Sequence, residues 1–299
     1  MTSAAAPLAD PRTLGALSAL VAERLRPTLG DAAPAEAREL LAALHDMPRH
    51  WASTSAHECL TDEAWRAALA AADRRAAGAP LQYAAGQAAF RHLTLAVDER
   101  VLIPRPETEV LVDLVLEATR ATPGGVVVDV GTGSGAIALA LASEGTFARV
   151  IATDVSLDAL AVARANVARC AAALRAPVEL RHGSLLAPVP ERGLSAVVSN
   201  PPYIALDEAA SLPASVRDWE PFVALFSGAN GMAAIARLVR EAAPALAPGG
   251  LLALEVDARR ASSAAELAVS HGGYADVRVM LDLTGRERFV VARRRESDG

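Results

Sequence analysis

Four consecutive residues, Asn200-Pro201-Pro202-Tyr203, carry groups suited to holding a planar –NH2 group. The two prolines fix the backbone and remove two N–H donors, so the backbone carbonyls there have fewer local partners. Asn200 adds a side-chain carbonyl and Tyr203 adds an aromatic face. Two acceptors with a ring beside them predict a receptor for an amide or amino group. Because Asn before Pro is also ordinary turn chemistry, the position of the tetrapeptide in the fold must support this interpretation.

A glycine-rich loop, Gly131-Thr132-Gly133-Ser134-Gly135, follows the apolar run 126–130. Glycines let a backbone approach a ligand closely, and the N-terminus of the helix expected after the loop favours anionic groups. Asp154 ends the next apolar run, roughly 20 residues on, where a carboxylate can accept both hydroxyls of a ribose. The alternative for Asp154 is an N-cap of the helix expected near residue 157.

The loop alone leaves two classes of enzyme open. Dinucleotide-dependent and S-adenosylmethionine-dependent enzymes both use such a loop, and Ala136 can serve as the third small residue of the dinucleotide pattern. A dehydrogenase has no use for an –NH2 receptor. The tetrapeptide therefore favours an enzyme that acts on a planar nitrogen.

Both motifs lie where expected strands end. From residue 107 onward, apolar runs alternate with segments of helical periodicity, which predicts an α/β fold with a parallel sheet covered on both faces. The expected strands cover residues 126–130, 150–153, 178–181, 196–199, 251–256, 277–281 and 288–291. The expected helices cover residues 107–120, 136–143, 157–173, 231–246 and 261–270.

The chain before this region has a different pattern. Residues 1–80 contain three segments with apolar residues at helical spacing, and Thr61 is an expected N-cap, so they predict a small helical domain. Residues 81–105 are expected to connect it to the domain at 106–299. Apolar alternation at 93–97 and at 101–103 predicts a β-hairpin there, with its turn at 98–100.

Composition excludes several functions. The 299 residues contain no lysine, which excludes a Schiff base and a P-loop lysine. Two cysteines argue against a disulfide scaffold and permit a reducing cytosol. Neither a membrane span nor a signal peptide is expected. The net charge of −6, with ten acids and eight arginines in residues 1–85, argues against a basic nucleic-acid-binding face.

The motifs together resemble the release factor glutamine methyltransferases. The glycine loop, Asp154 and the Asn200–Tyr203 tetrapeptide are similar to those of class I methyltransferases that act on planar nitrogen, and the segment Leu102-Ile103-Pro104-Arg105-Pro106-Glu107-Thr108-Glu109 narrows the resemblance to that family. Ser184 and Leu185 stand where the family commonly has an acid and an aromatic residue. Arg105 and Glu107 are expected to form a surface ion pair; the alternative is that Glu107 lies near the cofactor pocket.

The resemblance implies a Rossmann-like seven-stranded sheet and a helical N-terminal domain that recognises the release factor. S-adenosylmethionine would be held by Gly131, Thr132, Gly133, Ser134, Gly135, Asp154, Leu185 and Asn200. Asn200, Pro201 and Tyr203 would be catalytic, and Asn200, Pro201, Pro202 and Tyr203 would hold the substrate amide, with no metal. The substrate would be the Gln of the Gly-Gly-Gln motif in class I peptide chain release factors. The resemblance further implies a cytoplasmic monomer without stable nucleic-acid or membrane binding.

Other functions remain open at this stage. A ribosomal-protein glutamine methyltransferase and a nucleic-acid amino methyltransferase would use a similar –NH2 receptor. An NAD-linked oxidoreductase would share the glycine loop, and a cofactor-binding scaffold would need no turnover. Labelling of candidate acceptors distinguishes the first two from a release factor enzyme. The ligand that raises thermal stability tests for an oxidoreductase, and a bound cofactor without turnover would favour a scaffold.

Overall fold

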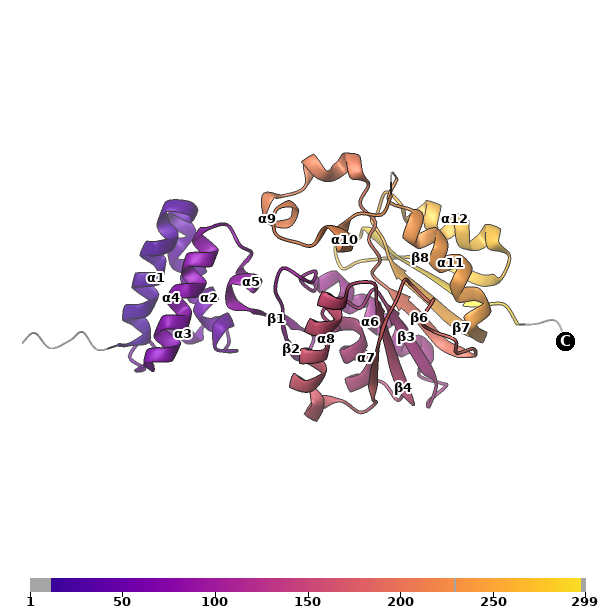
Figure 1. The fold of residues 1–299 in the computed structure, drawn as a ribbon, viewed down its shortest axis with the longest axis horizontal. Coiled ribbons are helices and arrows are strands. Elements are labelled where there is room, and N and C mark those ends of the chain that lie inside the picture. The colour runs from indigo at the N-terminus through magenta and orange to yellow at the C-terminus, as the bar shows by residue number, and fades with distance from the viewer. Residues whose placement is uncertain (1–11, 229, 297–299) are drawn as a thin grey trace, which may run out of the picture. The chain divides into compact units, whose positions relative to one another are not determined.

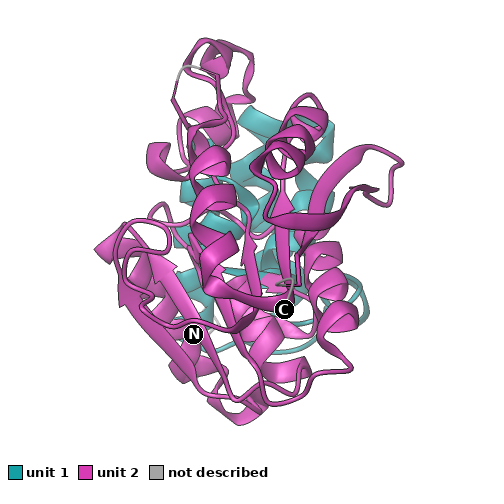
Figure 2. Cartoon of the chain, turned by 90° about the vertical axis from the view of Figure 1, so that its right-hand side faces the viewer, with its two compact units in different colours: residues 1–88 teal, residues 89–299 magenta. Residues whose placement is uncertain are grey.

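The chain forms two compact units, Met1–Ala88 and Ala89–Gly299 (Figure 2). The computed structural model describes residues 12–228 and 230–296. The boundary between the units falls inside strand β1 (Gln87–Phe90), within the stretch 81–105 that was expected to connect two domains. In the described parts of the chain, no helix is long and apolar enough to cross a membrane.

The first unit is helical, as its apolar spacing predicts. Leu14, Leu17 and Val21 are fully buried among the helices. Thr61 caps the fourth helix by accepting a hydrogen bond from the backbone N–H of Ala64 at 3.2 Å, which confirms the predicted N-cap. The helices are α1 (Leu14–Leu29), α2 (Ala33–Leu44), α3 (Trp51–Thr54), α4 (Asp62–Ala76) and α5 (Leu81–Ala85), with a 3-10 turn at Gly30–Ala32.

The second unit is built on a seven-stranded sheet with the strand order β5-β4-β3-β6-β7-β9-β8 (Figure 1). Its strands are β3 (Val126–Val130), β4 (Arg149–Asp154), β5 (Val178–His182), β6 (Leu194–Ser199), β7 (Leu246–Glu255), β8 (Tyr274–Leu281) and β9 (Glu287–Arg294). Its helices are α6 (Pro106–Thr119), α7 (Ala136–Glu144), α8 (Leu157–Arg169), α9 (Ala214–Arg217), α10 (Phe222–Leu225), α11 (Ala233–Ala245) and α12 (Ala261–His271). Short 3-10 helices cover Ala171–Ala173 and Leu206–Ser211.

Helices cover both faces of this sheet, as expected. Val127 and Val198 belong to the apolar core under α6 and α7, whereas their neighbours Val128 and Val197 belong to the core under α11 and α12. Successive strand residues point to opposite faces, so a strand buried on both sides must be apolar throughout. This explains the continuous valine runs in the sequence.

The sheet is mostly parallel, as expected, and has one antiparallel edge. Strands β3 to β7 pair in parallel, but β9 runs antiparallel to both β7 and β8. Only the short stretch 282–286 separates β8 from β9, and a parallel connection needs a crossover of a dozen residues or more. The spacing of the last two strands therefore dictates the antiparallel pairing.

The predicted hairpin is displaced along the chain. β1 pairs with β2 (Leu93–Ala96) around Arg91, which adopts φ +53°. A turn does form at 98–100, where the backbone N–H of Val101 donates to the Asp98 carbonyl, but it joins no strands. Val101 and Ile103 are buried, so their alternation gives a strand-like pattern although neither belongs to a strand.

Candidate active site

The glycine loop leaves the sheet at the carboxyl end of β3. Gly131 and Gly133 have φ of +72° and +54°, and a Cβ added to either would meet no atom within 4 Å. Their side of the loop is therefore open to a ligand, and a side chain there would fill that space. The N–H groups of Gly131 and Thr132 donate to the Thr153 carbonyl at 2.8 and 2.9 Å, which fixes the loop to β4.

The buried carboxylate of Asp129 supports the glycine loop through hydrogen bonds. Asp129 is fully buried, and its Oδ2 accepts hydrogen bonds from the Thr132 hydroxyl at 2.6 Å and the Ala138 N–H at 3.1 Å. Burial raises the pKa of Asp129 to about 7. Among the described residues, its Oδ1 has no hydrogen-bond partner. Asp129 thus holds the loop to α7 and adds negative potential beside it.

Asp154 stands at the carboxyl end of β4 beside the loop. Its Oδ2 accepts from the Gly133 N–H and its Oδ1 from the Ser156 N–H, both at 2.9 Å. The N-cap of α8 is Ser156, whose hydroxyl accepts from Ala159, so Asp154 is not the cap of that helix. Burial raises the pKa of Asp154, against the lowering effect of these backbone donors. Each carboxylate oxygen keeps a lone pair for a further donor.

Asn166 of α8 fixes the other side of the loop. Its amide exchanges two hydrogen bonds with the Ala96 backbone, at 2.7 and 2.9 Å, and donates a third to the Ser134 carbonyl at 2.9 Å. The side chain is fully buried. It therefore joins the end of β2 to the glycine loop.

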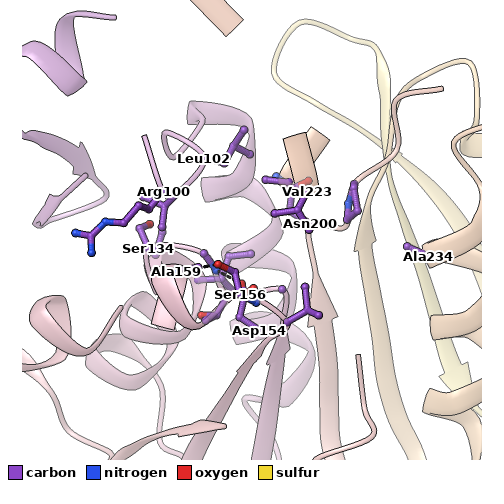
Figure 3. Close-up of a pocket in the computed structure, with 18 of the residues that line it drawn as sticks. Arg100, Leu102, Ser134, Asp154, Ser156, Ala159, Asn200, Val223 and Ala234 are labelled. Atoms are coloured by element: carbon purple, nitrogen blue, oxygen red, sulfur yellow. Dashed lines mark hydrogen bonds between the residues drawn. The ribbon is translucent and has the colours of Figure 1, made fainter. Parts of the chain in front are cut away.

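These elements surround one cavity of about 290 Å3. Because β4, β3 and β6 are parallel neighbours, Asp154, the glycine loop and Asn200 all lie at the carboxyl edge of the sheet, where open α/β sheets bind ligands. Figure 3 shows Ser156 next to Asp154, and Asn200 next to Val223. The wall includes Arg100, Val101, Leu102, Pro104, Arg105, Thr108, Gly131, Thr132, Gly133, Ser134, Ala136, Ile137, Asp154, Val155, Ser156, Ala159, Gly183, Ser184, Leu185, Asn200, Pro202, Val223, Ala224, Phe226 and Ala234.

Three predicted site residues do not contribute to this wall. Asn200 and Pro202 line it, whereas Pro201 is buried behind it and Tyr203 packs against the core under α11. Burial raises the pKa of Tyr203 to about 12. Gly135 begins α7 with φ +86° and acts as the turn into that helix.

The side chain of Asn200 is held by a chain of two hydrogen bonds. Its Nδ2 donates to the Thr108 hydroxyl at 3.3 Å, and that hydroxyl donates to Oε2 of Glu255 at 2.7 Å. Ser199 pairs with Leu254 across β6 and β7, so the residues that follow, Asn200 and Glu255, are neighbours. Burial raises the pKa of Glu255 to about 7, although Thr108 lowers it.

The segment between Asn200 and Gly231 forms one side of the pocket and is tied down by an ion pair. Arg105 does not pair with Glu107; its Nη2 lies 2.6 and 2.8 Å from the two carboxylate oxygens of Glu220. The Glu220 side chain is almost fully buried. Val223 and Phe226, a few residues on, line the pocket. Arg105 therefore belongs to the pocket, and its ion pair with Glu220 fixes the segment on this side.

Ser184 and Leu185 line the end of the pocket beyond β4 and β5. The Ser184 hydroxyl accepts from Nη1 of Arg237 at 3.0 Å, and Glu241 binds the same guanidinium at 2.5 Å. The Leu185 carbonyl accepts from the Thr153 hydroxyl at 3.0 Å. An arginine-held hydroxyl thus stands where an acid is common in the family that the motifs resemble.

The pocket fits S-adenosylmethionine on its own geometry. The open side of the glycine loop leaves space for the methionine end of the cofactor. Asp154 can accept from ribose hydroxyls, and the apolar wall beyond Leu185 suits a base. In the described part of the chain, no cluster of three His, Cys, Asp or Glu side chains could hold a metal ion.

Sequence analysis missed Thr108, Glu255 and Asn166 as site residues. Thr108 lies 92 residues from Asn200 and 147 from Glu255, and only the packed fold brings them together. Thr108 falls inside the segment Leu102–Glu109 that carried the family resemblance. The resemblance of that segment to the family was the feature of the sequence that could have indicated Thr108 as a site residue.

Comparisons with known proteins identify relatives of this chain. Residues 17–86 match the family model described as "PrmC N-terminal domain", and residues 107–212 match "Methyltransferase small domain". The chain is 44% identical to a Cereibacter sphaeroides protein named "Release factor glutamine methyltransferase" over 268 residues, 88% of this chain and 92% of that protein. It is 46% identical to a Moorella thermoacetica protein of the same name over 226 residues, 76% of this chain and 79% of that protein.

A solved structure supports the fold. The crystal structure of a methyltransferase from Pyrococcus furiosus matches with a TM-score of 0.52 at 20% identity, over 70% of this chain and 92% of that one. The pocket, the two family models and the extent of the similarity to named proteins agree. The chain belongs to the release factor glutamine methyltransferases, enzymes that use S-adenosylmethionine as the methyl donor.

Proposed function

We propose that this protein methylates the side-chain amide nitrogen of the glutamine in the Gly-Gly-Gln motif of class I peptide chain release factors. The relatives' names support the release factor as substrate class. The observation that carries the proposal is the position of Asn200, whose side-chain amide shares one pocket with Asp154 and the glycine loop. An acceptor for a substrate –NH2 group therefore lies beside the expected methyl donor site.

The chain's own groups provide position and charge stabilisation. S-adenosylmethionine supplies an electrophilic methyl group. An amide nitrogen is a poor nucleophile because its lone pair is delocalised, so the site must hold it at near-attack distance. Asn200 Oδ1 accepts an –NH2 hydrogen, and this bond strengthens as positive charge builds on the nitrogen. Pro202 shapes the wall, and Tyr203 packs against the core under α11.

We assign selection of the protein partner to the helical region, residues 1–80. The match of residues 17–86 to a family-specific model supports this assignment, because none of the pocket residues comes from that region. We further propose that the enzyme acts as a monomer. Release factors act in the cytoplasm, so we place the enzyme there.

A parallel labelling experiment tests the substrate. The full chain is incubated with methyl-labelled S-adenosylmethionine and, separately, with a class I release factor, the same factor with its Gly-Gly-Gln glutamine changed to Ala, a ribosomal protein preparation, and tRNA with DNA. Peptide mass spectrometry then locates the methyl group.

We expect label on the glutamine of the unmodified release factor and none on the Gln→Ala factor. Label confined to ribosomal protein or to nucleic acid would instead identify one of the alternative substrate classes. Cofactor binding without label on any acceptor would indicate a scaffold.

A further inference from the structure

We propose that Thr108 is a positioning residue that sets which end of the Asn200 side-chain amide faces the pocket. The inference deepens the proposed function and rests on it for the identity of the substrate –NH2 group. It concerns the direction of two hydrogen bonds. An asparagine amide can rotate by half a turn and exchange an acceptor for a donor, and only one of the two orientations suits an –NH2 substrate.

Three elements meet at Thr108. It lies in the first turn of α6, Asn200 follows β6, and Glu255 ends β7. Thr108 and Glu255 are only 4% and 2% exposed, so the hydroxyl and the carboxylate exchange few hydrogen bonds with water. In such surroundings the protein groups must satisfy one another.

The direction of the bonds follows from the hydrogens available. Above pH 7, where Glu255 is ionised, its carboxylate can only accept, and Thr108 has a single hydroxyl hydrogen, which the 2.7 Å contact assigns to Glu255. Thr108 Oγ1 can then only accept from Asn200, so Nδ2 must face it, at 3.3 Å. A flipped amide would set Oδ1 against an oxygen that has no hydrogen left to give. Oδ1 is thereby left for the pocket.

The orientation decides whether the receptor works. A substrate amide nitrogen presents two donors, so it needs Oδ1 of Asn200 as an acceptor. With Nδ2 in the same place, two –NH2 groups would face each other unpaired. Removing the Thr108 hydroxyl frees the amide to populate both orientations, and turnover falls in proportion to the loss of the productive one.

Two substitutions isolate this role. Thr108→Val keeps the size and branching of the side chain and removes the hydroxyl, whereas Thr108→Ser keeps the hydroxyl. Thr119→Val is the matched control, because Thr119 is a buried threonine of the same helix whose hydroxyl bonds only within that helix in the described structure, to the carbonyls of Val115 and Leu116.

Single-turnover methylation of release factor gives the first readout. At a pH above 7, we expect Thr108→Val to lower kcat by about twofold or more, twofold being the loss when the two amide orientations are equally populated, with little change in KM for S-adenosylmethionine. Thr108→Ser and Thr119→Val should stay near wild type. In an Asn200→Ala background, Thr108→Val should cost nothing further, because its effect passes through Asn200. An unchanged kcat for Thr108→Val, or an equal additional loss in the Asn200→Ala background, would overturn the proposal.

Nuclear magnetic resonance of the enzyme without substrate gives a second readout that is independent of turnover. In wild type, one Nδ2 proton of Asn200 should exchange slowly with water, and that protection should vanish in Thr108→Val but not in Thr119→Val. Equal protection in all three proteins would reject the positioning role. If wild type labels no release factor, the proposed substrate is wrong, and the exchange measurement alone then decides the role of Thr108.

Discussion

Asn200 is the residue on which the proposed chemistry depends most directly. Its backbone conformation is fixed by Pro201 and Pro202 after it, and its side chain is anchored on Thr108. We expect Asn200→Ala to remain folded, with a melting temperature close to wild type. Loss of one preorganised partner of the reacting group should lower kcat by about 100- to 1,000-fold.

Single-turnover transfer by the cofactor-saturated Asn200→Ala protein checks this prediction, and calorimetry confirms that the cofactor still binds. A rate within about threefold of wild type would make Asn200 a turn residue and assign the amide to another group.

Asp154 should control cofactor affinity and leave the acceptor site intact. It is buried and already accepts from Gly133 and Ser156, so a bound ribose would add charge-assisted bonds to an oriented carboxylate. We expect Asp154→Ala to weaken S-adenosylmethionine binding by roughly 1.5–3 kcal/mol. Isothermal calorimetry measures this directly, and unchanged affinity would limit Asp154 to supporting the loop.

Glu255 should make the free energy of unfolding depend on pH. Burial raises its pKa in the folded protein from the usual 4.5 to about 7. The folded state therefore binds this proton more tightly than the unfolded state, so its contribution is greatest below pH 4.5 and is lost as pH rises to about 7. Glu255→Gln removes this titration.

Urea unfolding between pH 4.5 and 8 checks the Glu255 prediction. The stability of Glu255→Gln relative to wild type should rise across pH 4.5–7 and then level off. Glu287→Gln, an equal change of charge at an exposed position, serves as the control. A difference that stays constant with pH would show that Glu255 does not titrate in this range.

At the scale of elements, the sequence predicted most helices and strands because their apolar periodicity reflects burial. The prediction failed where residues are buried without belonging to a paired strand. Val101 and Ile103 alternate with less buried residues, yet neither lies in a strand. Sequence analysis also found the motifs of the pocket but not Thr108 or Glu255. Hydrogen bonds between residues about a hundred positions apart leave no local pattern.

The segment between Asn200 and Gly231 depends on Arg260 for its conformation. Arg260 is 8% exposed; its Nε donates to the Asn230 carbonyl at 3.0 Å and its Nη2 lies 2.9 Å from Glu208. We expect Arg260→Ala to loosen this segment, at a cost of about 1–3 kcal/mol to its local stability. Faster cleavage by chymotrypsin beside the exposed Phe222 measures the effect.

The neighbouring arginine is the matched control for Arg260. Arg259 also pairs with Glu208, at 2.8 Å, but its side chain is 65% exposed. Exposed pairs contribute little, so Arg259→Ala should leave cleavage near the wild-type rate. Equal acceleration in both variants would mean that net charge, and not the buried anchor, governs the segment.

At the scale of the whole molecule, deletion of residues 1–80 separates recognition from chemistry. The deletion keeps β1 and β2, and with them the Ala96 contact to Asn166. We expect S-adenosylmethionine affinity to be retained. The kcat/KM for intact release factor should fall by about 100-fold, as expected for loss of a few central interface residues.

A short peptide containing Gly-Gly-Gln is the control substrate for the truncated enzyme, because it needs no extended interface and should be methylated at the full-length rate. Circular dichroism verifies that the truncated protein is folded. Near-normal kcat/KM for intact release factor would assign recognition to the second unit.

The three hydrogen bonds of Asn166 couple the glycine loop energetically to the end of β2. Because one rigid side chain bonds to both the Ser134 carbonyl and the Ala96 backbone, the glycine loop and the end of β2 cannot shift independently without leaving buried groups unpaired. Thermodynamic reciprocity then applies. A ligand that stabilises the conformation of the glycine loop therefore also stabilises the β1–β2 hairpin. A partner that binds the hairpin in that conformation raises the affinity of the loop for its ligand.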